Sequence, residues 1–213
     1  METYEDDNLR LVKEGPLGAF ANNVYLIQDR ASGEALIVDA PSDALRILDA
    51  LDGGSVTRII VTHRHGDHWA SIDALKSATN APVACHAADA ERYKDKVDAT
   101  IADGEEIAVG SLRVRAIFTP GHTPGSTCFL VGRHLISGDT LFPGGPGHSD
   151  SPADLRQSIE SITTRLFALP DDTLVHPGHG DGTTIAQAKR EYAVFASKQH
   201  PVDLCGDVSW EGH

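Results

Sequence analysis

The chain has 213 residues, 40% of them hydrophobic and 23% charged, with a formal net charge of −13. This length and composition are typical of one large globular domain with a buried core. An acidic chain without a basic stripe repels polyphosphate backbones, which excludes nucleic acid as a partner. Apolar runs long enough to span a bilayer are absent, which excludes a membrane partner, and the acidic N-terminus lacks the features of a secretory signal. We therefore expect a cytoplasmic protein, and the composition leaves its oligomeric state open.

Short β-rich runs alternate with helical patterns in the first half of the chain. Ser42 is the expected N-cap of a helix whose apolar residues are 44, 48 and 51, and a second helix carries Trp69, Ile72 and Leu75. This alternation is typical of βαβ units. The strands expected here are residues 23–28, 35–39, 56–61 and 82–85.

The second half repeats this alternation and ends in two helices. The first, residues 152–169, has Ser151 as N-cap, and the second covers residues 184–197. Residues 200–213 are expected to form an irregular tail. The strands expected here are residues 106–109, 112–118, 127–131, 134–137 and 173–176. Together these elements predict an α/β fold, a four-layer αββα sandwich, in a single domain spanning residues 1–213.

The stretch Thr62-His63-Arg64-His65-Gly66-Asp67-His68 directly follows an expected strand. Three imidazoles and one carboxylate within six residues need polar partners, and a metal ion satisfies them together. Imidazole and carboxylate ligands without thiolate suit zinc, iron or manganese. Further ligand candidates follow other strands in glycine-rich turns: His122, Asp139 and His179.

Four motifs in this order carry a family resemblance: T-H-x-H-x-D-H, G-H-T-P-G-S, S-G-D-T-L-F and P-G-H-G. From about Asn22 to Tyr192, the chain resembles the metallo-β-lactamase superfamily, and within it the glyoxalase II-like branch. The resemblance implies the metallo-β-lactamase fold and two divalent metal ions. Zinc is the expected metal, and iron and manganese are the alternatives. It implies one ion held by His63, His65 and His122, a second held by Asp67, His68 and His179, and Asp139 bridging them.

The resemblance also implies a reaction. A hydroxide shared by the two ions would attack an electrophilic carbonyl, with Asp67 as the catalytic group that orients this nucleophile. Asp39, Thr62 and Thr123 are candidates for fixing imidazole tautomers and loop geometry behind the ligands, and hydrogen bonding within turns and at strand ends is an equally good interpretation of each. The expected substrate is a small-molecule thioester or ester.

Two enzyme classes remain open. The first is a thioester or acyl ester hydrolase, similar to hydroxyacylglutathione hydrolase. The alternative is a persulfide dioxygenase with one iron at His63, His122 and Asp139. A lactonase, a β-lactamase and a non-catalytic binding module are minor alternatives. Zinc β-lactamases lack a bridging carboxylate like Asp139, and pseudo-enzymes commonly lose ligands that this chain keeps.

The segment after G-D-T-L-F bears on the substrate. In the resembled enzymes it tends to run through Gly-Cys-Gly to Arg or Lys, where the basic group helps to bind glutathione. Here residues 142–150 read Phe-Pro-Gly-Gly-Pro-Gly-His-Ser-Asp, without the cysteine or the basic residue. We therefore expect this loop to set substrate choice against glutathione thioesters, with Phe142, Gly145 and His148 in contact with the substrate.

Overall fold

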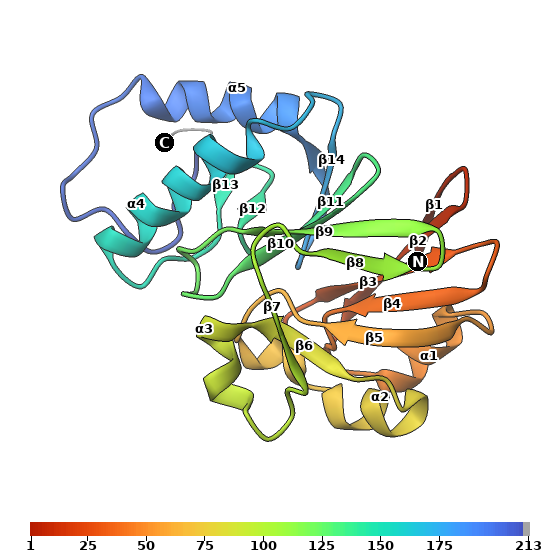
Figure 1. Cartoon of the computed structure of the whole chain (residues 1–213). Helices are drawn as coiled ribbons and strands as arrows, with labels where there is room; N and C mark the ends of the chain where they lie inside the picture. Colours follow the sequence, from red (N-terminus) through yellow and green to blue (C-terminus); the bar gives the residue numbers. More distant parts are fainter. Residues whose placement is uncertain (211–213) are drawn as a thin grey trace.

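A seven-stranded sheet and a six-stranded sheet lie face to face in the middle of the molecule (Figure 1), a computed structural model that describes residues 1–210. The strand order of the first sheet follows the chain from β1 to β7. Pairing is antiparallel from β1 to β4 and parallel from β4 to β7. The strands of this sheet are β1 (Glu2–Asp6), β2 (Leu9–Leu17), β3 (Asn22–Asp29), β4 (Glu34–Val38), β5 (Ser55–Ile60), β6 (Val83–His86) and β7 (Ala99–Ile101).

The second sheet has the order β15-β14-β11-β10-β9-β8, in which only β11 and β14 are parallel neighbours. Its strands are β8 (Glu106–Val109), β9 (Leu112–Phe118), β10 (Thr127–Val131), β11 (His134–Gly138), β14 (Leu174–Pro177) and β15 (Thr183–Thr184). A separate two-stranded ribbon joins β12 (Leu141–Phe142) to β13 (Gly145–Pro146).

Helices cover the outer face of each sheet (Figure 1). The helices against the first sheet are α1 (Ala44–Ala50), η1 (Gly66–Trp69), α2 (Ile72–Thr79), α3 (Ala87–Ala90) and η2 (Glu91–Tyr93). Those against the second sheet are α4 (Pro152–Ser161), the π-helical turn η3 (Ile162–Leu166) and α5 (Ile185–Ala196). Ser151 caps α4 through its hydroxyl, which accepts from the backbone N–H of Asp154 at 3.2 Å.

Three hydrophobic layers separate the four layers of structure. Because successive side chains of a strand point to opposite faces, Leu26 packs toward α1 and α2 whereas Ile27 packs between the sheets. The middle layer joins residues such as Leu36 of the first sheet to Phe129 of the second. The third layer lies between the second sheet and the helices α4 and α5, and includes Trp210 near the C-terminus.

The predicted αββα sandwich is confirmed, with differences at its edges. Asp43, rather than Ser42, is the N-cap of α1: it has a φ of 77°, and its carboxylate accepts from the N–H of Arg46. The sequence interpretation also missed β1, β2 and β7, which complete the first sheet, and the short strands β12, β13 and β15. Within residues 200–210 there is no helix or strand, as expected, and residues 211–213 of the predicted tail lie outside the described part. No helix in residues 1–210 is long and apolar enough to cross a membrane.

Candidate metal centre

The predicted ligands converge at one edge of the sandwich, where loops leave β5, β9, β11 and β14. The segment from β5 to η1 brings the histidine-rich motif to this edge. Gly178 lets the backbone after β14 approach closely, because a Cβ there would lie 2.3 Å from Asp139 Oδ1 and 2.7 Å from His68 Cε1. The glycine beside His179 is therefore a steric requirement of the site.

One group of possible ligand atoms comes from His63, His65 and His122. The His122 ring centroid lies 4.8 Å from that of His63 and 4.5 Å from that of His65. The Nε2 atoms of His63 and His122 are buried and have no hydrogen-bond partner. Burial lowers the pKa of His63 well below its usual value, so this imidazole is neutral and can offer a lone pair.

A second group comes from Asp67, His68 and His179. The Nε2 atoms of the two histidines are 3.3 Å apart, and each lies 3.4 Å from Asp67 Oδ2. Asn22, which the sequence interpretation did not single out, donates to the same Asp67 oxygen at 2.7 Å.

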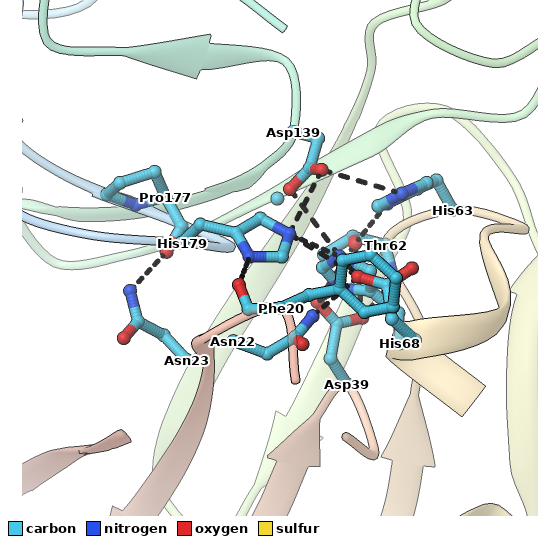
Figure 2. A network of polar contacts seen from close by, with 12 residues as sticks. Phe20, Asn22, Asn23, Asp39, Thr62, His63, His68, Asp139, Pro177 and His179 are labelled. Atoms are coloured by element: carbon cyan, nitrogen blue, oxygen red, sulfur yellow. Dashed lines mark hydrogen bonds and ion pairs between the residues drawn. The ribbon is translucent and has the colours of Figure 1, made fainter. Parts of the chain in front are cut away.

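Asp139 lies between the two groups (Figure 2). Its Oδ2 is 3.7 Å from His122 Nε2 and 3.4 Å from His179 Nε2, and its Oδ1 is 3.5 Å from His68 Nε2. Burial alone would raise the pKa of Asp139, but His68 and His179 outweigh it and hold this pKa well below its usual value. The site therefore favours the ionised carboxylate form of Asp139.

Hydrogen bonds behind the rings orient four of the five histidines. The Nδ1 atom of His68 lies 2.8 Å from Asp39 Oδ2, and that of His63 lies 3.0 Å from Thr62 Oγ1 (Figure 2). Thr62 in turn donates its N–H to Asp39 at 2.8 Å. A ring that donates from Nδ1 leaves the Nε2 lone pair free to bind a metal ion.

Backbone carbonyls serve the same purpose for the other two rings. The Nδ1 atom of His122 lies 2.8 Å from the carbonyl oxygen of His148, and that of His179 lies 2.8 Å from the carbonyl oxygen of Phe20. With both Nδ1 atoms donating, all four oriented rings direct Nε2 to the centre.

Thr123 bears on loop geometry. Its hydroxyl donates to Asp89 at 2.6 Å, so it holds the loop that carries His122. Asp89 is 1% exposed and also accepts from the backbone N–H groups of Arg64 at 3.0 Å and Gly125 at 2.9 Å. Asp89 thus joins the two loops that supply the first histidine group.

The donor set fits divalent metal ions. Three buried atoms without a hydrogen-bond partner, His63 Nε2, His122 Nε2 and Asp139 Oδ1, face the same small space. Such atoms destabilise a fold unless something satisfies them, and a metal ion accepts imidazole and carboxylate ligands together.

A cleft of about 830 Å³ opens onto these groups. The predicted substrate-contacting residues Phe142, Gly145 and His148 all line it. Phe20, which the sequence interpretation missed, lines the same cleft although 70% of its surface is exposed. The Phe142 and His179 rings lie 6.5 Å apart in a stacked arrangement, so aromatic surface adjoins the candidate ligands.

Comparisons with known proteins agree with this geometry. The chain is 36% identical to a hydroxyacylglutathione hydrolase of Cereibacter sphaeroides over 187 residues, covering 85% of this chain and 69% of that protein. It is 33% identical over 216 residues to a probable polyketide biosynthesis zinc-dependent hydrolase, BaeB, of Bacillus velezensis, covering 95% and 93%. The crystal structure of ETHE1 from Myxococcus xanthus is similar, with a TM-score of 0.75 and 30% identity, covering 88% and 86%.

The family model of the metallo-β-lactamase superfamily matches residues 17–179, which include all seven candidate ligands. The predicted resemblance is confirmed by this match and by the relatives above. The chain belongs to the metallo-β-lactamase superfamily, whose enzymes bind divalent metal ions.

Proposed function

We propose that the protein is a hydrolase of thioesters or related acyl esters that uses two divalent metal ions, with zinc as the expected metal. The observation that supports this proposal is a pair of ligand groups, each with histidine Nε2 atoms 3.4–3.9 Å from an Asp139 oxygen, that open onto a cleft bordered by Phe20 and Phe142. The likeness to BaeB, whose name describes a zinc-dependent hydrolase, supports zinc. The proposed metal ligands are His63, His65, Asp67, His68, His122, Asp139 and His179.

When bound, a pair of divalent ions lowers the pKa of a coordinated water and polarises a carbonyl. The chain's own residues supply orientation. The side chain of Asp67 is 20% exposed, and Asn22 donates to one of its oxygens, so the other can accept a hydrogen bond from the attacking water. That contact directs a water lone pair toward the acyl carbon. As the water oxygen bonds to this carbon, the bond from the carbon to the leaving sulfur or oxygen breaks, and the proton that the water gives up goes to the leaving group. The rings of Phe20 and Phe142 offer apolar surface for the acyl chain.

A panel of thioesters and aryl esters with the metal-loaded protein tests this proposal. Asp67→Ala should lower kcat by about 10²-fold or more, because it removes a ligand and the group that orients the water. Phe20→Ala is the comparison variant: it should raise KM for substrates with long acyl chains and leave the bound metal unchanged. If wild-type protein loaded with metal turns over no acyl substrate, the proposal is wrong.

A persulfide dioxygenase with one iron at His63, His122 and Asp139 is the second candidate. The likeness to ETHE1 supports this alternative, and the three side chains converge, with Asp139 Oδ2 3.9 Å from His63 Nε2 and 3.7 Å from His122 Nε2. A single iron per chain with oxygen uptake in the presence of a persulfide would favour it. Lactones and β-lactams in the same panel test the lactonase and β-lactamase alternatives, and any turnover excludes a purely binding role.

Glutathione thioesters should be poor substrates. Among the described residues that line the cleft there is no lysine or arginine to pair with the glutathione carboxylates. The double variant Pro146→Cys/His148→Arg restores the pattern of the resembled enzymes. It should raise kcat/KM for S-lactoylglutathione more than for a simple aryl ester. A wild-type kcat/KM for S-lactoylglutathione of about 10⁵ M⁻¹s⁻¹ or above would contradict this expectation.

A further inference from the structure

Residues 204–210, here called the C-terminal segment, run along the rim of the cleft and are anchored at both ends. Near its start, Gly206 and Ser149 exchange two backbone hydrogen bonds, of 3.1 and 2.9 Å. At its end, the N–H of Trp210 donates to the carbonyl oxygen of Gly144 at 2.6 Å. The Trp210 side chain is fully buried, with its ring centroid 5.1 Å from that of Tyr192. The segment therefore has a fixed position against the loop after β12.

Between these anchors, Asp207, Val208 and Ser209 line the same cleft as the candidate ligands. The carbonyl oxygen of Val208 lies so near Gly145 that a Cβ there would be 2.7 Å from it. His122 and Asp139 line this cleft too, and their buried Nε2 and Oδ1 atoms have no hydrogen-bond partner, which points to a bound ligand. A substrate that reaches these atoms thus passes beside the C-terminal segment.

The charge at this rim is negative. Asp207 Oδ1 lies 3.0 Å from His148 Nδ1, and Asp150 Oδ1 lies 3.7 Å from His148 Nε2. Both carboxylates are largely exposed, at 91% and 84%, and the His148 side chain contacts both. An anionic group on a substrate would face these carboxylates without a lysine or arginine among the described lining residues, whereas a cationic group would be attracted.

We propose that Asp207 is a specificity-determining residue, and that the natural substrate carries a neutral or cationic leaving group. This inference rests on the proposed function, because it requires an acyl substrate in the cleft. It extends that function from the bond that is broken to the charge of the group that leaves. The C-terminal segment, anchored by Trp210, holds this carboxylate at the rim.

Three acetyl thioesters that differ in leaving-group charge test the proposal with the metal-loaded protein. They are acetylthiocholine, which is cationic, S-acetyl-N-acetylcysteamine, which is neutral, and S-acetylglutathione, which is anionic. Wild-type kcat/KM should be lowest for S-acetylglutathione. Asp207→Lys should shift the anionic-to-cationic ratio of kcat/KM by roughly tenfold toward the anion, mainly through KM, and added salt should reduce this shift.

Asp203→Lys is the matched control. It makes the same change of net charge just before the C-terminal segment, at an exposed residue that does not line the cleft, and should shift the ratio by less than about twofold because bulk salt screens it. Calorimetry with two unreactive thioethers, S-methylthiocholine and S-methylglutathione, measures the same preference by binding alone. Asp207→Lys should weaken the binding of S-methylthiocholine and strengthen the binding of S-methylglutathione.

The outcomes separate the two proposals. If neither these thioesters nor the wider acyl panel is hydrolysed, the proposed function is wrong, and the thioether binding still decides the role of Asp207. If they are hydrolysed but wild-type prefers S-acetylglutathione, or if Asp203→Lys shifts the ratio as much as Asp207→Lys, the charge selection by Asp207 is refuted while the hydrolase proposal stands.

Discussion

Asp89 provides a quantitative test of how the site is held together. Its buried carboxylate accepts from the Arg64 N–H, the Thr123 hydroxyl and the Gly125 N–H, at 3.0, 2.6 and 2.9 Å. Hydrogen bonds to a charged group contribute about 1.5–3 kcal/mol each, and removing one partner of a buried charged network costs roughly 3–5 kcal/mol in total. Asp89→Ala should therefore lower the free energy of unfolding by about 3–5 kcal/mol.

Asp89→Asn should cost less, about 1–3 kcal/mol, because its amide keeps one acceptor oxygen but turns an NH₂ group toward a donor. The control is Asp73→Ala, which removes an exposed ion pair with Lys96 and should cost less than about 1 kcal/mol. Urea unfolding of metal-free protein gives all three values. An Asp89→Ala variant as stable as Asp73→Ala would refute the reasoning, as would unchanged metal affinity at the histidines of the two loops.

Three further predictions address pH, sterics and charge. Burial, with a contribution from His134, lowers the pKa of His176 to about 3 in the folded protein, against about 6.5 when unfolded. Between these pH values only the unfolded state binds the proton, so the free energy of unfolding falls with falling pH by about 1.4 kcal/mol per pH unit. His176→Gln should reduce this slope in urea titrations from pH 7 to 5. An unchanged slope would contradict the assignment to His176. Gly178→Ala places a methyl group 2.3 Å from Asp139 Oδ1 and should lower the affinity for metal ions at least about tenfold, while the circular dichroism spectrum stays unchanged. A variant with the metal affinity of the wild type would contradict this steric argument. Asp139→Asn should weaken the binding of both metal ions, because an amide does not neutralise cationic charge. Unchanged metal occupancy in elemental analysis would show that Asp139 is not a ligand.

Local patterns were enough to predict the sandwich and to select residues that meet in space. His63, His65 and His68 are close in sequence, and each strand end that carries His122, Asp139 or His179 also carries a glycine. Asp39 was a usable candidate because it ends a strand, and it does contact His68. These features can be recognised in the sequence because each depends on residues that are close together along the chain.

Residues brought to the site by tertiary packing had no such signal. Phe20 lies in a turn between β2 and β3, Asp89 in a short helix after β6, and Asp207 in a tail without regular structure. Each reaches the site through contacts of long sequence separation, such as the hydrogen bond from Thr123 to Asp89 across 34 residues. β2 was missed for a related reason: Lys13 and Glu14 interrupt its apolar pattern, yet both are buried, Lys13 by donating to Glu2 and Gly180.

Metal stoichiometry coupled to turnover tests the central claim most directly. Protein stripped of metal would be titrated with zinc, with bound ions counted by native mass spectrometry and hydrolysis of a neutral thioester followed in the same samples. The two ligand groups, with Asp139 close to histidines of both, predict two ions per chain and hydrolysis that appears only as the second ion binds. One ion per chain at saturation, together with oxygen uptake rather than hydrolysis when iron replaces zinc, would contradict the dinuclear hydrolase.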